Sequence, residues 1–238
     1  MNNSRTKRLP KILLGQSAVT LLILLIAGYL IMYSMGYKIN FISRKIVKSG
    51  MIVLSIDTKP DSIKINGVEK PIKTDSSYIL TPGYYDVQVN KNGYIDWSVR
   101  TQVEAEIVNY YNNIALFKND TALNELVDRN KIDYLNAPNS TLAVNAPKGL
   151  RYNDYEIWIE EKLITRYSEP ITSVSWYTDY RHVAYQQGDE IRIVDDYGQN
   201  DTLLVKLPDK TSAKFIFGAK SKELYISQGD KYYIVVIR

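Results

Sequence analysis

Cysteine is absent from this sequence, so disulfide bonds, thiol nucleophiles and thiolate metal ligands are excluded. Histidine occurs once, as His182, which leaves too few imidazoles for a histidine-based metal site. An internal repeat, described below, places His182 in a polar turn, and we predict that it is exposed at the surface. The sequence also has no glycine-rich phosphate-binding loop. We therefore expect no cofactor and no catalytic activity.

Strong charge of either sign is also lacking. The net charge is +4, from 30 Lys and Arg against 26 Asp and Glu, which is unlike the concentrated basic field of a nucleic-acid-binding protein. The hydrophobic content of 45% is instead that of an ordinary folded chain. Tyrosine is plentiful, with 20 residues against 4 Phe, and it suits half-buried sheet surfaces on which the ring packs and the hydroxyl stays hydrated.

One segment of 24 residues, Ile12 to Met35, carries no charge. As a helix it would be about 36 Å long, at about 1.5 Å per residue, which exceeds a hydrocarbon core of about 30 Å. We predict a transmembrane helix over residues 12–37 that is embedded in the lipid bilayer, with Tyr29, Tyr33 and Tyr37 on one face. The alternative is a signal peptide cleaved near Gly36, but the apolar run is longer than the usual stretch of about 7–15 residues.

Basic residues around this segment predict its orientation. The tail of residues 1–11 has three basic residues close to the helix, against Lys38 alone near the other end. The positive-inside rule then places the tail in the cytoplasm and the domains after the helix outside it. An alternative remains, in which the basic stretch Ser43–Lys48 lies on anionic lipid of the cytoplasmic leaflet.

Beyond the predicted helix the sequence follows a β-pattern. After a juxtamembrane linker at 38–49, residues 50–118 form short alternating runs separated by turn signals such as Asn66-Gly67. That rhythm predicts a small β-sandwich. Residues 119–141 are polar and predict a linker with one short helix over Thr121–Asn130, with Leu123, Leu126 and Val127 on one side. The expected fold class is therefore mainly β.

Residues 142–238 contain an internal repeat with an offset of 41 residues. Ser173–Val194 can be laid on Lys214–Val235, so that Gln187-Gly188-Asp189 meets Gln228-Gly229-Asp230. Each copy has the order strand, turn, strand, Gly-Asp turn, strand, and a period of about 40–45 residues built from strands is typical of propeller blades. A partial earlier unit precedes them. Because a propeller usually needs about 4–8 blades, we predict an incomplete, propeller-like antiparallel β region.

Residues 51–118 resemble the PEGA domain, a small β-sandwich module of bacterial and archaeal envelope proteins. The resemblance rests on three stretches: GMIVLSIDTKPDSIKINGVE, LTPGYYDVQVNKNGYIDW and VEAEIVNYYNNIALF. The tetrapeptide that names the family is Pro60-Asp61-Ser62-Ile63 here, so its glycine and alanine are replaced. The resemblance implies an envelope or surface protein with an interaction or spacer module, and it carries over no catalytic residues.

Two sets of residues are candidates for ligand contact. The loop DDYGQND offers oxygen ligands of the kind that calcium takes, although the spacing is not that of an EF-hand and a plain polar turn is the simpler interpretation. These weak metal candidates are Asp195, Asp196, Asn200 and Asp201. Aromatic rings that could stack on sugars form the second set, against an ordinary role in the sheet core: Tyr84, Tyr94, Tyr110 and Tyr111. Alternation predicts that Tyr84 and Tyr85 point to opposite faces.

These patterns favour a single-pass membrane protein of the cell envelope that acts as a non-catalytic binding or scaffold module for an envelope glycan or a protein partner. A second hypothesis makes the chain a subunit of an oligomeric envelope assembly, in which a partner completes the incomplete β region. A third is an anchored hydrolase acting on envelope polymer.

Overall fold

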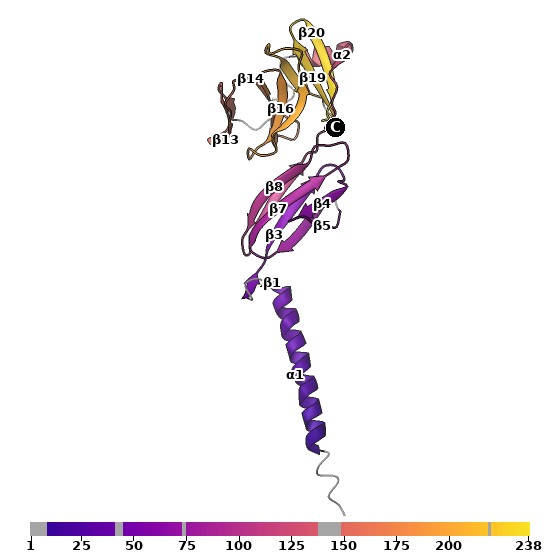
Figure 1. The fold of residues 1–238 in the computed structure, drawn as a ribbon, viewed down its shortest axis with the longest axis vertical. Coiled ribbons are helices and arrows are strands. Elements are labelled where there is room, and N and C mark those ends of the chain that lie inside the picture. Colours follow the sequence, from indigo (N-terminus) through magenta and orange to yellow (C-terminus); the bar gives the residue numbers. More distant parts are fainter. Residues whose placement is uncertain (1–8, 41–44, 73–74, 138–148, 219) are drawn as a thin grey trace, which may run out of the picture. The chain divides into compact units, whose positions relative to one another are not determined.

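The computed structural model describes residues 9–40, 45–72, 75–137, 149–218 and 220–238. It is a mainly β structure with one apolar helix near the N-terminus, which confirms the expected fold class (Figure 1). The basic tail up to residue 8, and residues 142–148 of the predicted repeat region, lie outside the described residues. Contacts divide the chain into two compact units. The first consists of Met1–Val53, Ser77–Tyr84 and Gln102–Tyr110, and the second of Leu54–Ser76, Tyr85–Thr101 and Tyr111–Arg238.

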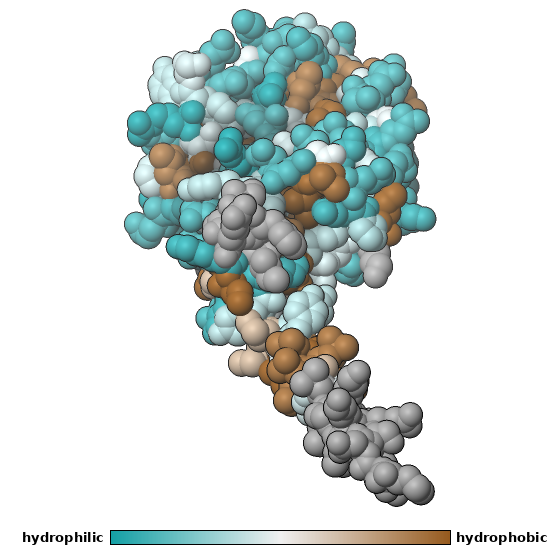
Figure 2. Space-filling model, turned by 60° about the horizontal axis from the view of Figure 1, so that its bottom comes forward, coloured by the Kyte–Doolittle hydropathy of each residue, from teal (hydrophilic) through white to brown (hydrophobic). Residues whose placement is uncertain are grey.

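Helix α1 (Leu9–Ser34) contains a segment, Gly15–Ser34, that is long and apolar enough to cross a membrane. The side chains of this segment are exposed, and hydrophobic residues are brown in Figure 2. Tyr29 and Tyr33 stack with ring centroids 6.3 Å apart, as their spacing predicts. The helix ends earlier than expected, because Gly36 has a φ of +81° and the next residue begins a strand. Tyr37 therefore lies outside the helix.

The expected juxtamembrane linker forms an antiparallel hairpin of β1 (Tyr37–Asn40) and β2 (Lys45–Lys48). Two further sheets follow, with strand orders β6-β3-β9 and β5-β4-β7-β8. Their strands are β3 (Gly50–Ile56), β4 (Ser62–Ile65), β5 (Val68–Lys70), β6 (Asp75–Leu80), β7 (Gly83–Asn90), β8 (Trp97–Val103) and β9 (Val108–Ile114).

Burial in these strands alternates as the two-residue period of a sheet requires. Val87 and Val89 of β7 are buried, while Tyr84 is exposed and Tyr85 is half-buried on the face of the two valines, as predicted. The predicted turn between β4 and β5 is also present, because Asn66 has a φ of +50° and Gly67 follows at +74°.

The segment after β9 is more ordered than a plain linker. Strand β10 (Asn124–Glu125) pairs with β20, and the short helix is α2 (Arg129–Asn136), so its predicted position at Thr121–Asn130 is wrong. Asp128 caps the N-terminus of this helix, because its carboxylate accepts a hydrogen bond from the N–H of Asn130 at 3.0 Å. Leu123 and Leu126, two of the apolar residues that suggested the earlier helix, lie on either side of β10 instead, and Leu126 is buried.

Three antiparallel sheets form the rest of the structure (Figure 1). The first has β11 (Leu150–Tyr152), β12 (Glu156–Ile159) and β13 (Lys162–Arg166), and the second has β14 (Ile171–Trp176), β15 (His182–Gln187), β16 (Glu190–Asp195) and β17 (Thr202–Lys206). The third has β18 (Lys214–Phe217), β19 (Glu223–Gln228) and β20 (Lys231–Val236), with β10 as its fourth strand.

The predicted repeat is confirmed in this region, since the offset of 41 residues joins His182 to Glu223 and Glu190 to Lys231 at the starts of equivalent strands. One core cluster contains buried residues from both four-stranded sheets, among them Ile193, Phe217 and Leu224. The repeats therefore bury their hydrophobic faces against one another, as stacked repeats must.

Candidate functional site

A groove with a volume of about 560 Å³ is lined by β11, β14 and β18, the first strands of the three repeat sheets. It lies entirely within the second compact unit. Its volume falls within the range of about 300–1,000 Å³ that is usual for small-molecule sites. Strands β14 and β18 hold equivalent positions in the two aligned repeats, and β11 of the preceding sheet adds the rest of the wall.

Aromatic rings line one part of this groove. Trp176 at the end of β14 and Tyr180 in the following turn meet edge to face, with ring centroids 6.2 Å apart. Tyr180 has a φ of +55°, a left-handed conformation that costs a bulky residue about 1–3 kcal/mol. Tyr152 adds a third ring, half of which is exposed. The groove therefore presents flat, partly accessible rings.

Hydroxyl groups line the groove beside these rings. The Ser173 hydroxyl donates to the carbonyl of Ala213 at 2.8 Å and lies 3.1 Å from the Ser212 hydroxyl, which joins β14 to the segment before β18. Lys214 is the one charged side chain among the described residues that line the groove. The lining thus offers rings for stacking and hydroxyls for hydrogen bonds, with little charge.

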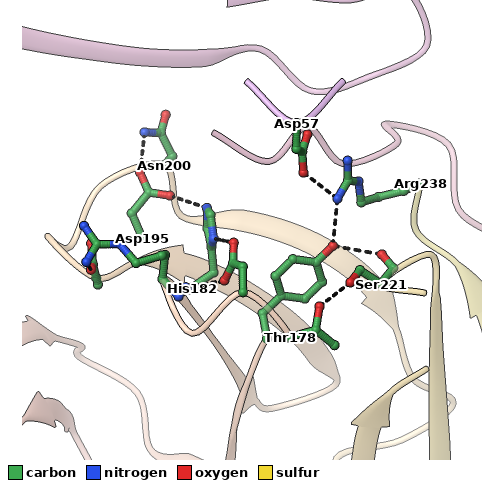
Figure 3. Close-up of polar contacts among 11 residues, drawn as sticks. Asp57, Thr178, His182, Asp195, Asn200, Ser221 and Arg238 are labelled. Carbon is green, nitrogen blue, oxygen red and sulfur yellow. Dashed lines mark hydrogen bonds and ion pairs between the residues drawn. The ribbon is translucent and has the colours of Figure 1, made fainter. Parts of the chain in front are cut away.

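Beside the groove, Tyr177 is buried and is held by a polar network (Figure 3). Its hydroxyl donates to the carbonyl of Ser221 at 2.8 Å and accepts from Arg238 Nη1 at 3.0 Å. The same Arg238 nitrogen lies 2.6 Å from Asp57 Oδ2, and Nη2 donates to the Thr58 hydroxyl at 3.1 Å. These bonds fix the tyrosine that forms part of the groove wall.

His182 is buried, with 4% of its surface exposed, so the predicted surface position is wrong. Its Nδ1 lies 2.7 Å from Asp179 Oδ2 and its Nε2 lies 2.9 Å from Asp195 Oδ1 (Figure 3). Burial by itself would lower the pKa of His182, but hydrogen bonds and charge from the two carboxylates outweigh it and raise the pKa to about 9. The charged imidazole thus links β15 to Asp195 on β16 and to Asp179 in the preceding turn. With both nitrogens engaged, it is not placed to act as a base.

The sequence held a signal for this link. His182 and Asp195 stand opposite each other in the antiparallel register of β15 and β16, and Asp179 lies three residues earlier in the turn. Cross-strand neighbours in a hairpin can be assigned once the turn is known. The polar turn suggested a solvated histidine instead, because the sequence did not reveal that Phe117 and Tyr177 cover the ring.

In the structure, the acidic side chains of this loop pair with cationic and hydrogen-bond-donating side chains of the protein. Asp195 binds His182 and accepts from Asn200 Nδ2 at 2.8 Å. Asp196 lies 3.2 Å from Arg181, and Asp201 lies 2.8 Å from Arg192. Among the described residues, no group of three or more carboxylates or imidazoles is arranged to hold a metal ion. Of the four candidate oxygen ligands, Asp195 and Asn200 therefore bond to each other, and Asp196 and Asp201 face arginines.

The four tyrosines proposed for ligand contact are divided between the two compact units. Tyr84 and Tyr110 are 64% exposed, but both lie in the first compact unit. Tyr94 is half-buried under Lys91, whose Nζ lies 5.5 Å from the ring centroid. Tyr111 is enclosed between other rings in the second unit, with centroids 5.6 Å from Trp97 and 6.1 Å from Tyr197.

The groove residues were not predicted from the sequence, because they come from three separate segments that only the fold brings together. A signal existed in the repeat, where Ser173 and Val174 align with Lys214 and Phe215, and all four residues line the groove. A scan against protein-family models and a search of curated proteins both return no match for this chain. The geometry therefore carries the functional argument.

Proposed function

We propose that this protein is a single-pass membrane protein of the cell envelope that binds a glycan, without catalysis, in the groove between β14 and β18. Helix α1 would be its anchor, with the N-terminal tail in the cytoplasm and the β-domains outside. The resemblance of residues 51–118 to PEGA modules supports an envelope location. The observation that carries the proposal is the groove, in which Trp176 and Tyr180 stand beside serine hydroxyls and a single lysine.

A glycan fits this lining better than a strongly charged ligand does. Sugar rings have apolar faces that stack on aromatic side chains, and their hydroxyls pair with serine and threonine hydroxyls. A single lysine accommodates an acidic sugar without demanding one. The rigid wall supplied by Tyr177 and the strained turn at Tyr180 would hold the rings in place before binding, which reduces the entropy lost on association.

The test uses the full-length protein in detergent and a soluble preparation of envelope polysaccharide, with binding followed by isothermal titration calorimetry. We expect Trp176→Ala to weaken binding at least tenfold, because aromatic anchors of binding sites commonly contribute about 2 kcal/mol or more. Trp158→Ala is the matched control, since Trp158 lies on β12 outside the groove lining. Equal binding by wild type and Trp176→Ala would contradict the assignment of the groove.

A second candidate function follows from the strand pairing. The third repeat sheet gains its fourth strand, β10, from a segment before the repeats, whereas the first sheet has three strands in the described chain and β13 at its edge. An added strand from a partner chain would complete that sheet. Chemical crosslinking in native membranes separates this alternative, because it predicts a crosslinked species that contains β13, and an entirely monomeric result contradicts it.

A further inference from the structure

Large apolar and aromatic side chains are exposed around one end of the first compact unit. They are Ile46 on β2, Ile79 on β6, Tyr84 on β7, and Ile107 and Val108 where β9 begins, and 42–64% of each side chain is exposed. Single exposed apolar residues are ordinary, but five at one end of a small unit indicate a surface that is covered in the working protein. We call these five residues the helix-end surface.

Hydrogen bonds hold this surface beside the end of helix α1. The backbone N–H and the hydroxyl of Ser49 both donate to the carbonyl of Gly36, at 2.9 and 2.7 Å, two residues after the helix ends. The N–H of Glu106, which directly precedes Ile107 and Val108, donates to the carbonyl of Ser49 at 2.9 Å. Lys38 Nζ donates to the carbonyl of Ile79 at 2.6 Å. The surface is thus tied to the point at which the chain leaves the helix.

The length of the apolar segment sets the depth of that point in a membrane. Gly15–Ser34 has 20 residues, and a helix of this length spans about 30 Å, which equals the thickness of a hydrocarbon core. When the segment crosses a bilayer, Gly36 lies at the boundary between hydrocarbon and headgroups. The headgroup layer continues for about 5–8 Å beyond that boundary. Residues that are hydrogen-bonded to Gly36 therefore lie within the headgroup layer.

The charged groups at this end are compatible with a lipid surface. Lys38, Lys45 and Lys48 stand against Glu104 and Glu106, and Lys48 Nζ pairs with Glu106 Oε1 at 2.6 Å. Lysine stems cover apolar surface while their ammonium groups reach phosphate. Because the charge balance is modest, the attraction must come mainly from the apolar and aromatic side chains.

We propose that the helix-end surface rests in the headgroup layer of the phospholipid bilayer that α1 crosses. The inference rests on the membrane anchor of the proposed function. The isoleucines and Val108 would enter the boundary of the acyl chains, and Tyr84 would place its ring at the level where tyrosines gather in membrane proteins. The bilayer is favoured over a protein partner because the anchor itself brings this end of the unit to the lipid.

The absence of cysteine makes a direct test feasible, since one introduced cysteine is the sole labelling site in the chain. Four full-length variants carry the environment-sensitive fluorophore NBD: Tyr84→Cys, Ile107→Cys, Leu24→Cys inside α1, and Val127→Cys in the second unit, which is 78% exposed. Each is reconstituted into phosphatidylcholine–phosphatidylglycerol vesicles. Fluorescence is compared with and without lipids that carry a nitroxide quencher either near the headgroup or deep in the acyl chain.

We expect the shallow quencher to reduce the signal from the labels at Tyr84 and Ile107, the deep quencher to reduce it at Leu24, and neither to change it at Val127. A label at Leu24 that escapes both quenchers would overturn the anchor, and with it the proposed function. If Leu24 is quenched while Tyr84 and Ile107 behave like Val127, the anchor stands and the inference about the helix-end surface is wrong. Equal quenching at all four positions also overturns it, because the fluorophore then partitions by itself.

A double variant tests whether the exposed apolar side chains themselves hold this surface at the lipid. Ile79→Ser combined with Val108→Ser removes two apolar side chains from the helix-end surface, and both positions are exposed, so the fold does not depend on their burial. In the Ile107→Cys background, we expect this change to lower the shallow quenching at Ile107 and to leave the deep quenching at Leu24→Cys unaltered. Unchanged quenching at Ile107 would contradict the inference.

Discussion

Deprotonating His182 at alkaline pH should cost the protein a large part of its stability. Burial favours the neutral imidazole, yet Asp179 and Asp195 reverse this effect and raise the pKa in the folded state to about 9. In the unfolded chain the pKa is about 6.5. The folded state therefore holds the proton more tightly, so the stabilisation is complete below about pH 6.5 and is lost as the pH rises through about 9. A difference of about 2.5 pKa units corresponds to about 3 kcal/mol.

The composition simplifies the assay of this effect. With one histidine and no cysteine, the amino terminus is the one other group expected to titrate between about pH 6 and pH 9. The free energy of unfolding is measured by urea denaturation of the full chain in detergent at a series of pH values, followed by tryptophan fluorescence. The control, His182→Gln, keeps the amino terminus and removes the titrating imidazole. It should lose about 3–5 kcal/mol near pH 6, because the buried Asp195 and the half-buried Asp179 lose their cation, and its stability should then be nearly independent of pH up to about 9.

Nuclear magnetic resonance supplies an independent measurement, because the single imidazole of the chain gives one set of signals whose titration reports the pKa directly. A pKa in the folded protein at or below about 6.5 would refute the argument that the two carboxylates outweigh burial. A wild-type free energy of unfolding that stays flat across the same pH range would refute it as well.

Three further substitutions test the packing. Gly50→Ala should destabilise the protein by about 3 kcal/mol or more, measured by thermal unfolding, because the added Cβ would lie 2.1 Å from the carbonyl oxygen of Glu104; unchanged stability would contradict this. Arg238→Met should cost about 1–3 kcal/mol in urea denaturation by leaving Asp57 without its cation, and combining it with Asp57→Asn should restore part of the loss. Leu126→Ala should cost about 2–5 kcal/mol and speed hydrogen exchange in β10 and β20, and exchange equal to wild type would show that Leu126 does not hold β10.

Local pattern was sufficient for much of the fold. A strand buried on one face requires alternation, so the order of residues in β7 suffices to place Val87 and Val89 on one face and Tyr84 on the other. The Asn66-Gly67 turn could be placed for a similar reason, because few residues tolerate its positive φ values. The repeat with an offset of 41 residues likewise follows from self-similarity along the chain.

Other features depend on residues that are distant in sequence. Strand β10 becomes a strand because β20 offers an edge to it, about a hundred residues later, and nothing in its own two residues requires this. The tertiary structure also determines the environment of Leu126. This residue had suggested a helix, but it follows β10 and is buried. Short segments take the conformation that their neighbours stabilise, and propensity is overridden there.

The candidate site divides in the same way. The amino-acid order alone fixes the charge-free segment of α1, the scarcity of imidazole and thiol, and the strands that recur in each repeat, because these are properties of composition and period. The groove, the buried His182 between two aspartates, and the bonds from Arg238 to Asp57 and Tyr177 arise when the strands are brought together in space. Burial and charge pairing are properties of neighbours, and folding determines which residues become neighbours.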